Sequence, residues 1–472
     1  MRRPLAIASA LALAACSAPG ARAHGADLGA LSPPPLVESQ RPLPTPSSGP
    51  IASAAPKSDE LPGDAESDGE VAEALTRVAR ARELPIKKVV HGRHLGREEL
   101  LVQLKKKMYE EVPEKVVHLQ GEEYRALELM PVDYDFETGL LKLLQSQIAG
   151  YYDPDDKTMY LLDDLGGSLR DVTLNHELIH ALQDQSFDLQ PRLKYRPGKG
   201  DEESALQTLI EGDATSGMMD AAGTSALAMD DDTIGSLFSI SSDIESLGSD
   251  TPPFIRDSLV SPYVDGFKFV GALRRRNGWK GVDDAFLRPP TTTEQILHID
   301  KFLAHEPALV VPDPTIDALG SGYGVGYTDT MGELGFRLMF MDKAPRKMAE
   351  TAAAGWGGDR FVVAENDTGP DDRLYAVGMH LRMDTANDAR EIEEMLSYAV
   401  VKKSAAGGAC RERPELGPIA WQMRGVDAAL VAGPYRIEHG KVQSASTCAD
   451  AAKWLTEVLA DKILEDKTKV NP

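Results

Sequence analysis

The chain has 472 residues, of which 51 are Lys or Arg and 74 are Asp or Glu, so its formal net charge at pH 7 is −23. This acidic balance argues against a nucleic-acid-binding protein, which needs basic surface to meet phosphates. Beyond a polar N-terminal stretch, about 400 residues remain, enough for two or three domains with sizeable cores.

The N-terminus has the features of an export signal. Two arginines follow Met1, and residues 5–15 form an apolar stretch too short to span a bilayer. Leu13-Ala14-Ala15-Cys16 resembles a bacterial lipobox, in which the cysteine is lipidated, and the serine that follows is typical of outer-membrane sorting. We therefore expect a signal peptide over 1–16 and an exported outer-membrane lipoprotein, anchored to the membrane through Cys16 and facing the periplasm or the cell surface. Cleavage after Ala23 would instead release a secreted protein.

The next segments are predicted from composition and hydrophobic period. Residues 17–70 are rich in Pro, Ser, Ala and Gly without a hydrophobic period, which predicts a disordered tether. Residues 71–145 are mostly helical by period. Two short strands, 149–152 and 158–162, are predicted around the turn Asp153-Pro154-Asp155-Asp156-Lys157.

The most informative motif is His176-Glu177-Leu178-Ile179-His180, an H-E-x-x-H sequence in an amphipathic helical pattern with a candidate N-cap at Asp171–Thr173. Residues four apart lie on one face of a helix, so His176 and His180 can bind one Zn²⁺. Glu177, beside them, can take a proton from a zinc-bound water. The alternative is a core helix that carries two incidental histidines.

A catalytic zinc needs a third protein ligand and one open position. Residues 202–219 form a second helical pattern, and Glu211 lies in its middle, next to a glycine that lets another backbone approach closely. A glutamate beside a predicted core face needs a partner or a role. We therefore predict Glu211 as the third ligand, with Glu203 as the alternative.

Together these residues resemble a known family. The stretches His176–Gln185 and Glu211-Gly212-Asp213-Ala214 are similar to gluzincin-type zinc metallopeptidases, above all to a largely uncharacterised prokaryotic group. Three later segments are also similar to that group: Pro262–Gly266, Pro289–His298 and Gly355–Arg360. The zinc motif is specific, whereas the later segments mark a relationship without a known role.

The resemblance implies an α+β fold with a zincin-like catalytic domain over 71–310, in which a small sheet lies beside the metal-binding helices. Strand 158–162 would be the edge of that sheet and pair with an extended substrate, although a solvent-facing hairpin is the alternative. Related peptidases donate to the oxyanion from a downstream Tyr or His, for which Tyr263 and His298 are candidates. Where gluzincins often place an acid after the ligand glutamate this chain has Thr215, so Asp213 or Asp184 is expected to orient a histidine.

Short strand and helix patterns alternate from about residue 311 onward, as in 360–364 and 386–401, and predict a smaller α+β C-terminal domain over 311–472. Apart from Cys16, the chain has only Cys410 and Cys448. In an exported protein the default is a disulfide between them, with two free buried thiols as the alternative.

These observations predict a zinc-dependent peptidase with one Zn²⁺ held by His176, His180 and Glu211. A zinc-activated water would hydrolyse a peptide bond of a peptide or protein substrate, with Glu177 as the general base. Two alternatives stay open: a non-proteolytic zinc amidase of the cell envelope, and a catalytically silent zinc-binding envelope lipoprotein.

Overall fold

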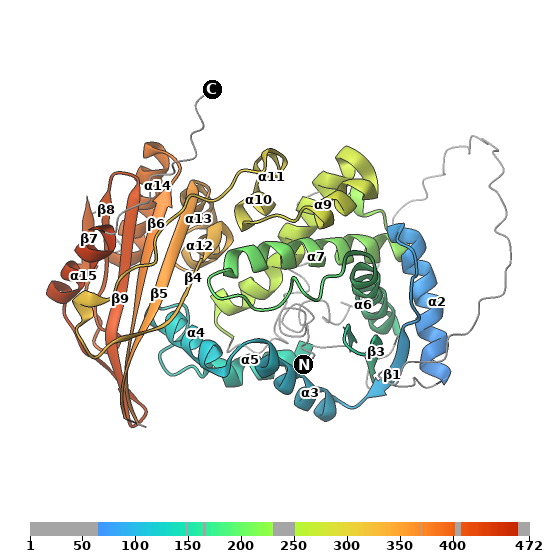
Figure 1. Cartoon of the computed structure of the whole chain (residues 1–472), viewed down its shortest axis with the longest axis horizontal. Coiled ribbons are helices and arrows are strands. Elements are labelled where there is room, and N and C mark those ends of the chain that lie inside the picture. Colours follow the sequence, from blue (N-terminus) through green and yellow to red (C-terminus); the bar gives the residue numbers. More distant parts are fainter. Residues whose placement is uncertain are drawn as a thin grey trace, which may run out of the picture.

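In the computed structural model, a mainly helical body adjoins an antiparallel sheet with its own helices (Figure 1). The structure describes residues 65–147, 150–163, 167–229, 251–369, 371–401 and 407–460. The predicted signal peptide, Cys16 and most of the predicted tether lie outside these residues. The predicted α+β class is confirmed.

The helical body contains a small sheet and most of the long helices. Its elements are α2 (Ala65–Arg82), β1 (His91–Leu95), α3 (Arg97–Glu111), α4 (Glu114–Ala126), α5 (Phe136–Gln147), β2 (Gly150–Asp153), β3 (Thr158–Leu162), α6 (Gly167–Phe187), α7 (Gly200–Ala221), η2 (Ala226–Ala228), α9 (Pro253–Leu287), α10 (Thr293–Leu297) and α11 (Ile299–Ala304). Helix α9 has a kink at Asn277 and Gly278, whose backbones are not helical.

The C-terminal part is built on seven strands. Its elements are η3 (Asp317–Leu319), β4 (Gly324–Asp329), α12 (Gly332–Met341), α13 (Arg346–Ala353), β5 (Trp356–Gly369), β6 (Asp372–Met383), α14 (Ala386–Val401), β7 (Gly408–Arg411), β8 (Ile419–Arg424), β9 (Asp427–Glu438), β10 (Lys441–Ser444) and α15 (Cys448–Ala460). The strand order is β4-β5-β6-β9-β8-β7, with β10 paired to β9, and all of these pairs are antiparallel. Cys410 and Cys448 form the predicted disulfide, which ties β7 to the start of α15.

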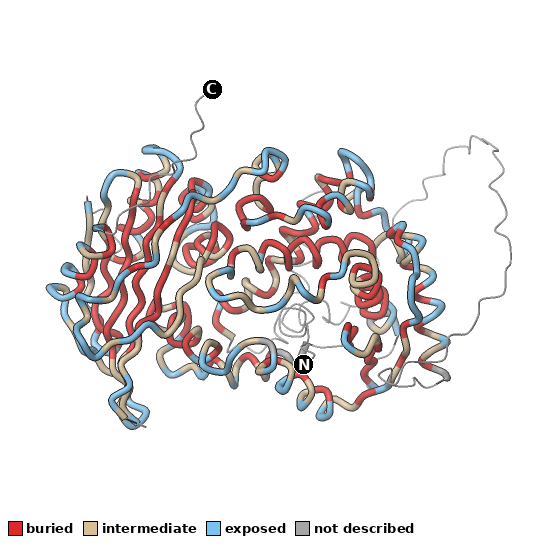
Figure 2. The backbone as a smooth tube through the Cα atoms, in the orientation of Figure 1, coloured by how far each residue is buried: buried red, intermediate tan, exposed pale blue. Residues whose placement is uncertain are grey.

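Both faces of the seven-stranded sheet are covered, because alternate residues of a strand point to opposite sides. Val362 and Ala364 of β5 pack in the core that contains Trp454 of α15. The neighbouring Phe361 and Val363 belong to the largest core cluster, on the other face. Figure 2 shows the buried residues running along these strands and through the central helices of the body.

The largest core does not stop at the predicted domain boundary of 310 and 311. Leu104 of α3 and Leu119 of α4 are in the same buried cluster as Val363 of β5 and Trp421 of β8. The two parts therefore share hydrophobic burial, which is the main favourable term in folding. Among the described residues, no helix combines the length and the apolar character that a bilayer span requires.

Two expectations about boundaries are wrong. Residues 65–70, predicted in the tether, form the start of α2, where the Asp68 carboxylate accepts a hydrogen bond from the backbone N–H of Gly92 (2.8 Å) and Glu70 pairs with Arg170 (2.6 Å). Tertiary contacts thus order a stretch whose composition alone predicts disorder. The predicted N-cap at 171–173 is also wrong, because α6 already begins at Gly167.

The small sheet corrects the predicted edge strand. Its order is β1-β3-β2, with β1 parallel and β2 antiparallel to β3. Strand β3, residues 158–162, is therefore the middle strand, and its backbone is paired on both sides. The prediction failed because β1 comes far earlier in the chain, and no local pattern shows that it pairs with β3. Strand β2 is the edge strand nearest to α6.

Helices α7 and α9 cross at two glycines. A Cβ added to Gly212 would lie 2.1 Å from the carbonyl carbon of Gly266, and one added to Gly266 would lie 2.1 Å from the carbonyl oxygen of Thr208. Only glycine permits this approach, which confirms the role predicted for the residue after Glu211. The crossing places Tyr263, one turn before Gly266, beside the part of α7 that carries Glu211.

Candidate metal centre

Helices α6 and α7 bring together the three predicted ligands. The Nε2 atom of His176 lies 3.1 Å from Glu211 Oε2 and 3.1 Å from His180 Nε2, and His180 Nε2 lies 3.6 Å from Glu211 Oε2. The side chains of His176 and Glu211 are buried, whereas that of His180 is 12% exposed. These three residues form a group whose ligand atoms converge on one point.

The spacing of the three atoms fits a tetrahedral zinc ion. Bonds of about 2.0–2.1 Å at tetrahedral angles place neighbouring ligand atoms about 3.3 Å apart. The observed separations of 3.1, 3.1 and 3.6 Å bracket that value. Two imidazole nitrogens and one carboxylate oxygen are also the donor set of catalytic zinc sites that keep a fourth position open.

The charges of the site favour a cation between these atoms. Although burial opposes ionisation, His180 and the hydrogen bond from His176 lower the pKa of Glu211 to about 2. Burial likewise opposes protonation of His180, but the Glu211 charge outweighs it and raises the pKa of His180 to about 9. Burial lowers the pKa of His176. A metal ion would replace a proton in compensating the buried carboxylate.

The side chain of Glu177 extends from α6 to the edge of the small sheet. Its Oε2 accepts a hydrogen bond from the backbone N–H of Tyr152 in β2 (3.1 Å). Its Oε1 is buried and has no hydrogen-bond partner among the described residues. Burial raises the pKa of Glu177 to about 8. A buried carboxylate oxygen without a donor indicates that something else, such as a water or a substrate proton, meets it.

Two of the candidate ligands, His180 and Glu211, are each hydrogen-bonded to a glutamine. Gln183, one turn after His180, accepts a hydrogen bond at Oε1 from His180 Nδ1 (2.8 Å). Its Nε2 donates to the carbonyl oxygen of Ile210 (3.0 Å) and to Asp213 Oδ2 (2.8 Å). Gln207, one turn before Glu211, donates from Nε2 to Glu211 Oε1 (2.6 Å).

Asp213 is in turn fixed by a fully buried arginine. Arg82 of α2 donates from Nε to Asp213 Oδ1 (2.5 Å) and from a second nitrogen to Asp283 (2.7 Å). Its guanidinium carbon lies 4.3 Å from the ring centre of Trp279, and that of Arg274 lies 3.6 Å from the same ring. Both cations are therefore in contact with the indole.

The two acids expected to orient a histidine have different positions. Asp213 reaches His180 only through Gln183, so its predicted role is indirect. Asp184 accepts hydrogen bonds from the hydroxyl of Tyr152 (3.2 Å) and from Lys157 (2.7 Å) instead. It thus fixes the β2–β3 turn against α6.

The two predicted oxyanion donors, Tyr263 and His298, lie in different parts of the molecule. The Tyr263 ring is fully buried, with its centre 5.8 Å from that of His176. His298 lies outside the metal group and pairs with Glu333 of α12 (2.9 Å), at the side of the molecule where Thr293 meets the first turn of α7. The alternative ligand Glu203 likewise lies outside the group and accepts a hydrogen bond from the backbone N–H of Arg196 (2.6 Å).

The later segments of the resemblance hold the start of α7 in place. In the segment Pro289–His298, Thr293 donates from its N–H (3.0 Å) and its hydroxyl (2.5 Å) to Asp201 in the first turn of α7. In the segment Gly355–Arg360, Arg360 donates to the carbonyl oxygen of Gly198, two residues before α7 (2.9 Å), whereas Asp359 accepts the N–H groups of Met331 and Gly332 at the start of α12 (2.9 and 3.0 Å). Their role is therefore to fix the helix that carries Glu211.

Sequence reasoning missed Gln183, Gln207, Arg82 and Trp279. The two glutamines have a signal in their spacing, because each lies one helical turn from a predicted ligand and on the same face. Arg82 and Trp279 have none, since the contacts that define them join helices far apart in the chain.

A second group of acids lies outside this centre. Glu294, Glu306 and Asp384 approach one another around Lys301, whose ammonium lies 2.5, 3.1 and 2.8 Å from them. The lysine charge occupies the position that a metal ion would take. The group is therefore an ion-pair network.

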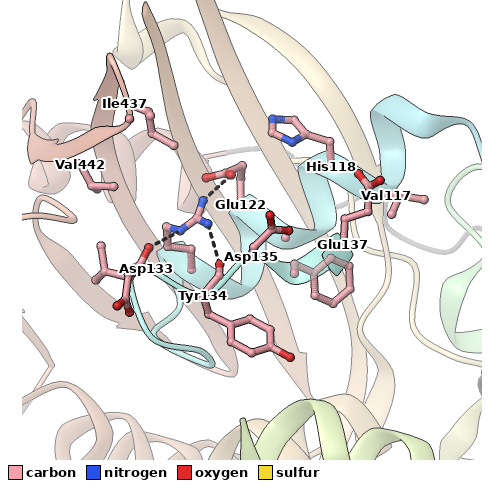
Figure 3. A pocket seen from close by; sticks show the side chains of 14 residues that line it. Val117, His118, Glu122, Asp133, Tyr134, Asp135, Glu137, Ile437 and Val442 are labelled. Atoms are coloured by element: carbon pink, nitrogen blue, oxygen red, sulfur yellow. Dashed lines mark hydrogen bonds and ion pairs between the residues drawn. The ribbon is translucent and has the colours of Figure 1, made fainter. Parts of the chain in front are cut away.

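A pocket of about 390 Å³ lies between α4, the loop before α5 and the β9–β10 hairpin (Figure 3). In it, Arg125 donates to Glu122 and to the carbonyl oxygens of Val132 (3.0 Å) and Tyr134 (3.1 Å). Arg125 thus joins α4 to the loop before α5 at this junction between the helical body and the sheet.

Comparisons with known proteins identify part of the chain only. Residues 322–445 match a family described as "Domain of unknown function (DUF8575)". This range runs from β4 to β10 and covers the seven strands, but not the helices of the metal centre. No curated protein and no solved structure matches the chain.

Proposed function

We propose that the protein is a zinc-dependent peptidase. The observation that carries this proposal is the convergence of His176, His180 and Glu211 at separations suited to tetrahedral zinc, with the Glu177 carboxylate beside them. A bound Zn²⁺ would supply a Lewis acid that activates water near neutral pH and polarises a carbonyl group.

Glu177 is suited to move a proton. Its Oε2 is fixed by the Tyr152 N–H, which leaves the buried Oε1 as the atom that can take a proton and release it to a leaving amine. Burial raises its pKa to about 8, which brings it into the range of an efficient general base or acid near neutral pH.

The outer edge of β2 is suited to bind an extended peptide. The Tyr152 N–H points away from β3 and donates to Glu177, so the edge of β2 that does not pair with β3 faces α6. By the alternation of an antiparallel ladder, Gly150 presents its backbone at the same edge. Backbone pairing there would bind peptides with little regard to side chains.

The setting is proposed to be the cell envelope. The Cys410–Cys448 disulfide supports an exported protein, because such bonds persist in oxidising compartments. Membrane fractionation of the wild type and of Cys16→Ala tests the lipid anchor at Cys16: the variant is expected to leave the membrane fraction. A wild type found only in the soluble fraction would contradict it.

The decisive experiment compares zinc-loaded wild type and Glu177→Gln on an unfolded protein substrate. We expect the variant to bind zinc normally and to lose activity by a factor of about 10²–10⁴. A variant as active as the wild type would exclude the proposed role of Glu177. Wild-type hydrolysis of muropeptides but not of proteins would replace the peptidase by an envelope amidase. A wild type inactive on every substrate would leave a silent zinc-binding protein.

A further inference from the structure

The side-chain amide of Gln183 can have only one orientation. One end lies within hydrogen-bond distance of two groups that can only accept, the backbone carbonyl of Ile210 (3.0 Å) and the carboxylate of Asp213 (2.8 Å). Arg82 donates to the other oxygen of that carboxylate (2.5 Å). The NH₂ group must therefore be at this end, and it uses both of its hydrogens there.

The opposite end of the amide is then the oxygen, and it faces His180 Nδ1 at 2.8 Å. An amide oxygen has no hydrogen to donate, so Nδ1 must carry the proton of this hydrogen bond. The lone pair of the neutral imidazole is consequently on Nε2. That atom points at His176 Nε2 (3.1 Å) and Glu211 Oε2 (3.6 Å).

We propose that Gln183 is a positioning residue, which holds His180 in the Nδ1–H tautomer with Nε2 directed at the metal. The inference rests on the proposed zinc site and adds to it a residue that the zinc motif does not contain. Gln183 also ties the two metal-binding helices together, since the carbonyl that it binds belongs to Ile210, the residue before Glu211.

Gln183 is hydrogen-bonded to one partner of a buried ion pair. Asp213 and Arg82 are both 0% exposed, and their opposite charges compensate each other. Arg82 is further held against Trp279. Gln183 thus transmits the position of a buried ion pair to His180 without placing a second negative charge on the imidazole. A metal-binding histidine usually has a partner of this kind at its other ring nitrogen.

The test measures zinc affinity of the full-length protein by competition with a chromogenic chelator. Gln183→Met keeps the length of the side chain and removes its hydrogen bonds, and we expect zinc affinity to fall by about 10–100-fold. The matched control is Gln185→Met on the same helix, where the glutamine is hydrogen-bonded to the backbone of Lys87 and Lys88. The control is expected to bind zinc like the wild type.

Three outcomes are distinguished. Equal zinc affinity of Gln183→Met and the wild type would overturn this inference and leave the zinc site intact. No zinc binding by the wild type would overturn the proposed function and this inference together. Loss of affinity in both glutamine variants would show a general effect of the substitution on α6 and count against a specific role.

A second measurement needs no variant of Gln183. Long-range ¹H–¹⁵N correlation spectra of the zinc-loaded wild type, labelled at histidine and assigned with His180→Asn, report which nitrogen of His180 carries the proton. We expect the proton on Nδ1 and the metal on Nε2. A proton on Nε2 with the metal on Nδ1 would overturn the inference, whatever the stability of the glutamine variant.

Discussion

Gly212 of α7 and Gly266 of α9 pack backbone to backbone at a helix crossing that adjoins the third predicted ligand, Glu211. A Cβ at position 212 would be 2.1 Å from the carbonyl carbon of Gly266, which no side-chain movement can relieve. The crossing therefore fixes the distance between α7 and α9, and with it the position of Tyr263 beside His176.

The crossing predicts a large effect of one methyl group. Gly212→Ala should lower the free energy of unfolding by about 1–3 kcal/mol or more, as overpacking does, and reduce zinc content. The control is Gly271→Ala in α9, where a Cβ meets only the end of the Arg275 side chain, at 3.3 Å. That variant should be neutral or slightly stabilising, because alanine favours helices. Chemical denaturation checks both; equal stabilities would contradict the close crossing.

If Glu211 is the third zinc ligand, substitutions of Glu211 and Glu203, both in α7, should differ in their effect on zinc binding. Glu211→Ala should abolish stoichiometric zinc binding, because it removes the only carboxylate in the group formed by the described residues. Glu203→Ala should keep the zinc, since Glu203 binds the backbone of Arg196 instead. Metal analysis of the purified proteins decides between them, and retention of zinc by Glu211→Ala would move the ligand elsewhere.

The Arg82–Asp213 ion pair predicts that removing one partner lowers stability strongly, and that removing both charges restores part of the loss. Arg82→Met leaves the Asp213 carboxylate buried without its cation, and should cost about 3–5 kcal/mol of unfolding free energy. Removing the charge as well, in Arg82→Met with Asp213→Asn, should recover part of that loss. A double-mutant cycle by urea denaturation measures the coupling. Strictly additive effects would mean that the two side chains do not interact.

A buried acid at the start of α7 predicts a pH dependence of stability. Burial raises the pKa of Asp201 to about 7, although hydrogen bonds from Thr293 oppose the shift. In the unfolded chain the value is that of an ordinary Asp, about 4. Because the folded state binds the proton more tightly, the free energy of unfolding should fall as the pH rises from about 4 to 7 and level off above that.

Asp201→Asn keeps the oxygen that accepts from Thr293 and removes the titrating group. Its unfolding free energy should therefore depend less on pH between about 4 and 7, and exceed that of the wild type above this range. Asp300→Asn, at an exposed position in α11, is the control for a change of one charge. An unchanged pH slope in Asp201→Asn would contradict the burial of an acid with a raised pKa.

Local sequence patterns predicted the residues of the site better than its surroundings. His176, His180 and Glu211 were predictable because helical spacing decides which side chains share a face, and the glycine after Glu211 indicated a close approach. The position of β3 in the middle of the small sheet was not predictable, because its parallel pairing with β1 joins segments separated by α3, α4 and α5. The Arg82–Asp213 pair likewise depends on how α2 packs against α7.

The attachment of α7 to the C-terminal sheet has a consequence for how the protein can be divided. Asp329 at the end of β4 accepts the N–H of Gly200 in the first turn of α7 (2.7 Å), and Arg360 of β5 donates to the carbonyl of Gly198 (2.9 Å). A fragment that ends near residue 310 would keep every predicted zinc ligand and lose these anchors. We therefore expect the smallest fragment that keeps the candidate metal centre in place to include the sheet, and unfolding of the sheet to coincide with loss of any bound metal.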